Sequence, residues 1–191
     1  MKKYELTEET FTVFGKTLYR IRAVRDFGSV KTGEFGGYIE KEENLSHFGN
    51  AWVFDNAWVF DNARVYDNAW VFGNAWVFNN ARVYDNAWVY DDAWVCGDAK
   101  VYGDAWVSGN AEVFNTRHFF VQGPIGSRNG FITFYRTKDN TVEVRCGCFS
   151  GSLQKFVDRV EETHGGSRYE KEYKLAAELA KVCIRLEGES R

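Results

Sequence analysis

Two cysteines, Cys146 and Cys148, flank a single glycine and are the first candidates for chemistry. Thiolates and imidazoles are good zinc ligands, so His118 or His164 could complete a metal site with them. The spacing is not typical of zinc sites, however, and alternation from Val142 places both cysteines on one face of a strand. Free cysteines are often simply buried. We therefore expect two core thiols, with no metal site and no cofactor.

A glycine-containing loop after residue 122 has the composition of an anion site. Its candidate ligand-binding residues are Gly123, Gly126, Ser127 and Arg128. Backbone amides near glycines, a hydroxyl and a guanidinium together form the kind of concavity that holds a phosphate or another small anion. The loop has no phosphate-loop spacing and does not clearly open a helix, so a strand connection that needs Gly and Pro is the alternative.

A row of basic residues recurs at 18-residue intervals, each followed two positions later by a tyrosine. The row consists of Arg64, Arg82 and Lys100, with Tyr66, Tyr84 and Tyr102. Such a row could track phosphates and stack bases. Because Asp67 and Asp85 lie close by, a solvated face of self-compensating charge is the preferred interpretation. Direct nucleic-acid binding is not expected.

The three histidines do not form an evident catalytic group. None lies between Ala51 and Asn115, and His47, His118 and His164 are outside that stretch. No Ser/His/Asp or paired-carboxylate arrangement with credible spacing accompanies them. We assign no catalytic residue, and an enzyme is disfavoured.

The element that must position all these residues is a six-residue repeat, Ala-Trp-Val-Phe-Asp-Asn, which runs from residue 51 to 114. Val recurs at every sixth position from Val53 to Val113, and Ala from Ala51 to Ala111. The Asp, Asn and Gly pairs between them tolerate the left-handed backbone conformation of a sharp corner. Each unit is therefore predicted to be a short strand and a turn, with Val and Ala inside a stack of parallel strands.

A second period sets the number of units per coil, because the residue before Val follows the order Trp, Trp, basic. Three units per coil give three faces, two of them aromatic and one basic. The first aromatic face carries Trp52, Trp70, Trp88 and Trp106, and the second carries Trp58, Trp76 and Trp94. Contiguous exposed tryptophan is uncommon on a monomer, so we expect all seven to contribute to an interface of a homo-oligomer, a trimer or a dimer. Cover by the chain itself is the alternative.

The repeat resembles the left-handed β-helix hexapeptide-repeat family, in which an aliphatic residue and a small residue four positions later face inward, as Val53 and Ala57 do. Phe54 departs from the small or acidic residue usual in that slot. Gly36-Gly37-Tyr38 and Gly49-Asn50-Ala51-Trp52 are similar to segments in uncharacterised hexapeptide-repeat proteins of bacteria, prophages and phages. The resemblance covers about the first two thirds of the chain and implies a left-handed coil. It also implies an alternative function, acyl transfer with His118 or His164 as the base.

The fold class is therefore mainly β, with three parts. Residues 1–45 are predicted to form a β-hairpin around Gly15-Lys16 and a cap that covers the first coil, and residues 46–116 the left-handed parallel β-helix. Residues 117–191 are predicted to form a small α+β domain. Its expected strands are 118–122, 131–137 and 141–149, and its two helices begin at about Ser152 and at Ser167, the latter with a capping-box signature.

Composition and charge suit a protein without a membrane span. The 191 residues have a net charge of −3, and no window is long and apolar enough to cross a bilayer. We expect a cytoplasmic protein, in the host cytoplasm if it is phage-encoded. Residues 51–115 carry nine acidic residues against three basic ones, whereas residues 116–191 carry thirteen basic against ten acidic.

The expected function is a non-catalytic binding protein, encoded by a phage or prophage, whose oligomerising β-helix presents the carboxy-terminal domain for recognition. The expected target is a host defence protein, which it would inhibit, or a nucleotide, which it would sequester as a small anionic ligand near Arg128. A further alternative is acidic mimicry of DNA toward a nuclease. The carboxylates that would serve it are Asp55, Asp61, Asp67, Asp85 and Asp98.

Overall fold

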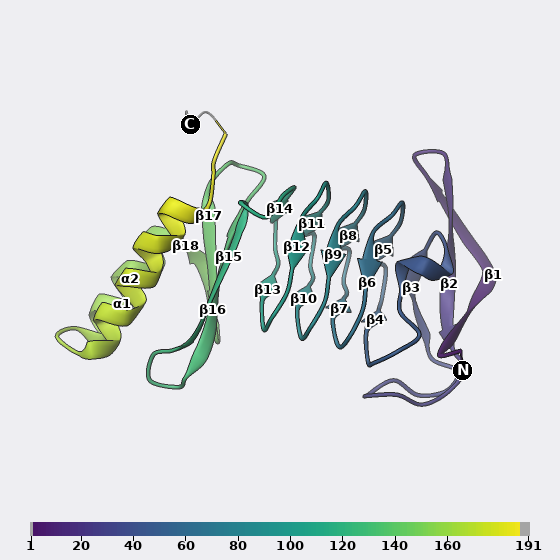
Figure 1. Ribbon diagram of the computed structural model, residues 1–191, viewed down its shortest axis with the longest axis horizontal. Helices are drawn as coiled ribbons and strands as arrows, with labels where there is room; N and C mark the ends of the chain where they lie inside the picture. The colour runs from purple at the N-terminus through teal and green to yellow at the C-terminus, as the bar shows by residue number, and fades with distance from the viewer. Residues whose placement is uncertain (1, 188–191) are drawn as a thin grey trace.

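A stack of short parallel strands forms the middle of the molecule in a computed structural model that describes residues 2–187 (Figure 1). The chain is mainly β, with a parallel β-solenoid of about four turns and two helices near its carboxyl end. A hairpin and a short 3-10 helix precede the solenoid, and a four-stranded antiparallel sheet follows it. No helix within residues 2–187 is long and apolar enough to cross a lipid bilayer.

The solenoid strands are two residues long, and each of the first eight pairs in parallel with the strand 18 residues further along. Trp52 pairs with Trp70, and Arg64 pairs with Arg82. The strands are β4 (Trp52–Val53), β5 (Trp58–Val59), β6 (Arg64–Val65), β7 (Trp70–Val71), β8 (Trp76–Val77), β9 (Arg82–Val83), β10 (Trp88–Val89), β11 (Trp94–Val95), β12 (Lys100–Val101), β13 (Trp106–Val107) and β14 (Glu112–Val113). They form three sheets, ordered β13-β10-β7-β4, β12-β9-β6 and β5-β8-β11-β14, the last continuous with the amino-terminal strands.

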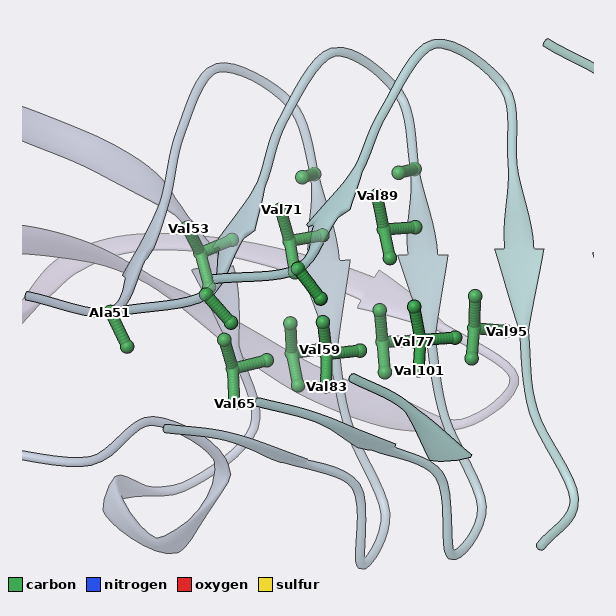
Figure 2. Packing of buried hydrophobic residues seen from close by; sticks show 14 of the residues in the cluster. Ala51, Val53, Val59, Val65, Val71, Val77, Val83, Val89, Val95 and Val101 are labelled. Atoms are coloured by element: carbon green, nitrogen blue, oxygen red, sulfur yellow. The ribbon is translucent and has the colours of Figure 1, made fainter. Parts of the chain in front are cut away.

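The interior of the solenoid is filled by the two invariant residue types of the repeat. Every repeat Val and Ala from Ala51 to Val113 is at most 1% exposed. Rows of valines from the three sheets point toward one another across this narrow core (Figure 2). The predicted inward placement of Val and Ala is confirmed, and burial of these apolar side chains supplies the main favourable term for folding.

The corners use left-handed backbone, as predicted. Positive φ values occur in the repeat at Asp55, Asp61, Asp67, Gly73, Asn79, Asp85, Asp91, Gly97, Gly103 and Gly109. Several of these aspartates accept the backbone amide at the same corner one turn later, as when Gly73 N–H donates to Asp55 Oδ2 at 3.2 Å. Side-chain amides form a second ladder, in which Asn50, Asn68 and Asn86 each donate to the residue 18 positions on. These bonds hold the corners in register.

The predicted hairpin and cap are present at the amino end. β1 (Tyr4–Val13) and β2 (Lys16–Ala23) pair antiparallel, and β3 (Phe35–Ile39) pairs with β2 and then in parallel with β5. A 3-10 helix, η1 (Glu42–Asn44), follows. The cap corrects the assignment of Trp52 to an interface, because this indole is 0% exposed and packs against the rings of Tyr4 and Phe27.

Lys3 is an unusual part of this cap, because it is a fully buried ammonium without a carboxylate partner among the described residues. Its Nζ donates to the Ala51 carbonyl at 2.6 Å and lies 4.8 Å from the centroid of the Phe27 ring. Burial, with the nearby charge of Arg25, lowers the pKa of Lys3 from 10.5 to about 8.

The carboxy-terminal module has one more strand than predicted. Its strands β15 (Phe119–Ile125), β16 (Gly130–Arg136), β17 (Val142–Cys146) and β18 (Phe149–Ser152) form one antiparallel sheet. The single strand expected over 141–149 was wrong, because Gly147 adopts a φ of +56° and reverses the chain between β17 and β18. The prediction treated Gly147 as one more alternating position.

Two helices cover the face of this sheet that points away from the solenoid (Figure 1). They are α1 (Leu153–His164) and α2 (Arg168–Cys183). The hydroxyls of Ser152 and Ser167 accept backbone N–H groups in the first turns, which confirms both predicted helix starts. Ile132, Phe134 and Val144 of the sheet pack against Phe156 and Ala177 of the helices in a core separate from that of the solenoid.

The buried ammonium of Lys3 predicts a pH-dependent stability. Because its folded-state pKa is depressed, unfolding takes up a proton between pH 8 and 10.5, and the folded state gains stability as the pH rises through that window. Lys3→Met has no group that titrates at this position, so it lacks this gain. The difference in unfolding free energy between the native protein and the variant should therefore shift in favour of the native protein by on the order of 2 kcal/mol from pH 8 to 10.5. Urea unfolding at a series of pH values measures it. A difference independent of pH would contradict this account.

Candidate functional site

A cavity of about 620 Å³ lies where the last solenoid turn meets the carboxy-terminal module. Asp104 and Trp106 contribute from the solenoid, and Ser127 and Arg128 from the loop after β15. Residues of β16, β17 and β18, the turn after β17, and helices α1 and α2 complete the wall. The volume is in the range of small-molecule sites.

The structure divides the four predicted ligand-binding residues into two pairs. Ser127 and Arg128 line the cavity, whereas Gly123 and Gly126 do not. Gly123 lies within β15, where an added Cβ would come 2.5 Å from the ring of Phe131, so close packing explains this glycine. The Gly126 N–H donates to Glu172 Oε2 at 2.7 Å. A carboxylate of the chain itself therefore occupies the Gly126 amide, which is not free to bind a ligand anion in this structure.

Positive charge in the cavity comes from three arginine side chains. Arg145 is fixed, because its Nε donates to Ser108 Oγ at 3.0 Å and its guanidinium lies 5.2 Å from the centroid of Tyr90. Arg159 makes an exposed ion pair with Glu162 that stabilises little. Arg128 makes no ion pair or side-chain hydrogen bond within residues 2–187.

One carboxylate, Asp104, also lines the cavity, and it accepts the Asn86 side-chain amide at 3.0 Å. The three guanidiniums therefore outnumber the carboxylates of the lining. Because apolar walls strengthen the field of such charges, the arrangement favours an anion.

Aromatic rings form much of the rest of the wall. They are Trp106, Phe131, Phe149, Phe156 and Tyr173. Burial and the neighbouring Cys146 raise the pKa of Tyr173 to about 12, so its hydroxyl stays protonated at neutral pH and can donate a hydrogen bond. An apolar, aromatic wall with a few cationic groups suits a ligand that is planar and negatively charged.

The two cysteines separate in a way that the sequence pattern did not indicate. Cys146 is half-buried, and burial raises the pKa of its thiol, whereas Cys148 is exposed. The prediction of two core thiols was therefore wrong for Cys148, which follows the Gly147 turn. Within residues 2–187 no three His, Cys, Asp or Glu side chains are grouped closely enough to hold a metal ion.

Only one of the three histidines reaches the cavity. His164 lines it, with its ring 5.6 Å from that of Tyr173. His118 is buried at the end of the solenoid, where its ring nitrogens contact the Phe114 amide and the Asn115 side chain. Burial and the charge of Arg136 lower the pKa of His118, which favours its neutral form. His47 stacks on Tyr4 in the amino-terminal cap.

The remaining tryptophans form two stacks on the outside of the solenoid. Trp58, Trp76 and Trp94 stack in one, and Trp70, Trp88 and Trp106 in the other, with centroid separations of 4.5 to 5.2 Å. Mutual stacking and the hairpin residues Phe11 and Phe14 cover part of these rings. Trp94 is the most exposed of the seven, at 36%.

The basic row is exposed and not compensated by ion pairs in the part of the chain described. Arg64, Arg82 and Lys100 make no salt bridge there, and the Asp85 carboxylate accepts the Gly103 amide instead. Tyr84 stacks between Tyr66 and Tyr102, with ring centroids 5.0 and 5.5 Å away, so both faces of the Tyr84 ring are covered.

No sequence pattern pointed to Arg145, Arg159 or Tyr173 as cavity residues. Arg145 lies on a strand and Arg159 and Tyr173 on separate helices, so only the packing of these elements brings them together. Trp106 was expected on an outer face, and its place at the end of its sheet puts it at the cavity.

Comparison with known families supports the repeat architecture. Residues 63–79 and 81–97 each match the model of the YdcK beta solenoid repeat. The match lies entirely within the solenoid and includes none of the cavity residues. No curated protein matches the chain.

Two glycines of this site provide a matched test of its packing. Gly126 and Gly147 both have positive φ, but an added Cβ at Gly126 would lie 1.9 Å from Tyr173 Oη, whereas at Gly147 it meets nothing within 4 Å. Gly147→Ala should cost about 1 kcal/mol, from backbone strain alone. Gly126→Ala should cost roughly 2 kcal/mol more, because Tyr173 must move. Urea unfolding measures both, and equal costs would contradict the packing at Gly126.

Proposed function

We propose that this chain is a non-catalytic binding protein whose cavity at the carboxyl end of the solenoid holds a small anionic ligand. The observation that carries the proposal is the cavity charge: three arginines line it, and Arg128 has no partner among residues 2–187. An unpaired guanidinium beside apolar walls is well placed to bind a phosphate or carboxylate. The solenoid acts as a rigid support for this site.

Two alternatives have less support. Acyl transfer would need a base, and His164 is the histidine that lines the cavity. Asp104 is the one carboxylate in the same lining. Acidic mimicry of DNA would need outward, dense negative charge. Asp55, Asp61 and Asp85 instead accept backbone amides at the corners, so one oxygen of each carboxylate is already hydrogen-bonded within the solenoid.

The finer features of the architecture belong to the same proposal. Three hexapeptides per turn agree with strand pairing at an offset of 18 residues, whereas the left-handed coil rests on the sequence resemblance. Self-association through the second tryptophan face agrees with the exposure of Trp94 and of Phe14, at 36% and 72%. A phage or prophage origin and the inhibition of a host defence protein stay hypotheses that rest on the sequence resemblance.

Removal of the Arg128 guanidinium tests the binding function. Arg128→Ala should weaken binding of ribose 5-phosphate by roughly 10- to 100-fold, because a hydrogen bond to a charged group contributes about 1.5–3 kcal/mol. Isothermal titration calorimetry measures the affinity. Arg117→Ala, an exposed arginine outside the cavity, is the matched control and should bind normally. Binding unaffected by Arg128→Ala would remove this cavity as the anion site.

Self-association has a separate test. Trp94→Ser should lower the molar mass measured by light scattering toward that of one 22.0 kDa chain, because it removes the most exposed indole of the second face. Trp70→Ser changes the other face and serves as the comparison. A native protein that is already monomeric, or a mass unchanged in Trp94→Ser, would contradict an interface at this face.

A further inference from the structure

We propose that the anionic ligand is a nucleotide whose base stacks on Trp106 and so continues the tryptophan ladder by one layer. This inference rests on the proposed anion site and specifies the ligand class. It is based on two features at the same end of the solenoid: the tryptophan stack ends at Trp106, and arginines line the cavity beside it.

The ladder ends at Trp106 because the repeat ends there. Trp70, Trp88 and Trp106 stack with centroids 5.2 Å apart and interplanar angles of 5° and 7°. β13 is the outermost strand of its sheet, so no fifth strand of this sheet adds an indole beyond Trp106. Within residues 2–187, Trp88 is the one aromatic residue in stacking contact with Trp106. The indole is partly exposed and lines the cavity.

The carboxy-terminal module takes the place of the missing turn without filling the ladder position. The Trp106 backbone N–H donates to Thr133 Oγ1 at 3.0 Å, which satisfies the strand edge with a small side chain. The Arg145 Nε donates to the hydroxyl of Ser108, which directly follows β13. Because Trp106 and Arg145 both line the cavity, the space beside this indole can take a planar ring with a guanidinium in the same cavity.

The amino end of this stack is covered within the repeat itself. The ring of Phe54 lies 5.1 Å from that of Trp70 at an interplanar angle of 62°, and Trp52 is 0% exposed against Tyr4 and Phe27. At the carboxyl end the module instead leaves a cavity of about 620 Å³ that Trp106 lines. The amino end of the stack is therefore covered by a ring, whereas its carboxyl end borders open space.

The charges around this position favour phosphate on the ligand. Arg128, Arg145 and Arg159 line the same cavity, and the one lining carboxylate, Asp104, is bound to the Asn86 amide. Glu162 faces Arg159, and Glu172 is held by the Gly126 amide. A ring that stacks and a phosphate that binds guanidinium occur together in nucleotides, and a cavity of this volume accommodates one.

The test compares ligands with and without a base on matched variants. The probes are the four ribonucleoside 5′-monophosphates and ribose 5-phosphate, titrated against the full-length protein by calorimetry. At least one nucleotide should bind more tightly than ribose 5-phosphate. Trp106→Leu should weaken that nucleotide by about 5- to 150-fold, as expected for loss of one base stack, and leave ribose 5-phosphate within about twofold. Trp70→Leu, in the same ladder but outside the cavity, should leave both affinities unchanged.

Each outcome separates the two proposals. If nucleotides and ribose 5-phosphate bind equally and both depend on Arg128, the anion site stands and base stacking is wrong. If Trp70→Leu weakens nucleotide binding as much as Trp106→Leu, the effect comes from the ladder as a whole, and stacking on Trp106 is again wrong. If no probe binds at millimolar concentration, the anion site and the nucleotide inference both fail.

Discussion

The constraint on which the rest of the structure depends is the 18-residue register of the solenoid. Val and Ala must face inward in every unit, since a two-residue strand buries nothing unless it is stacked on copies of itself. Once these side chains are fixed inside, the outer slots of the repeat also align at intervals of 18 residues, and many of them meet the same residue type. Indoles stack on indoles, phenols on phenols and side-chain amides on side-chain amides. The outer ladders are consequences of the inner one.

A repeat of this kind has two ends that it cannot complete by itself, and the two caps solve this in different ways. The hairpin covers Trp52 with Tyr4, at the expense of burying the Lys3 ammonium. The carboxy-terminal sheet instead makes edge contacts through Thr133 and Arg145 and leaves Trp106 beside a cavity. The proposed binding site is therefore an incompletely filled end of the solenoid.

The sequence predicted what is periodic and failed where the chain departs from the period. Inward Val and Ala, left-handed corners at Asp and Gly, and helix starts at Ser152 and Ser167 all follow from local chemistry. The strand break at Gly147 was missed, because a single glycine in an alternating segment does not reveal its φ. Of the candidate site, Ser127 and Arg128 were predicted, whereas Arg145 and Tyr173 reach the cavity only through tertiary packing. Likewise, the burial of Trp52 depends on residues far away in the sequence, Tyr4 and Phe27.

The most direct test of the register is the unfolding free energy of two insertion variants. One duplicates residues 69–86, a full period, and the other duplicates residues 81–86, a single unit; each copy is placed after Asn86. The full-period insertion keeps every ladder in place and should raise the unfolding free energy, because it adds one complete turn. The single-unit insertion keeps Val and Ala inside but sets tryptophan against arginine on the outer faces, and should not raise it. Equal stabilisation per added residue by both insertions would contradict the account.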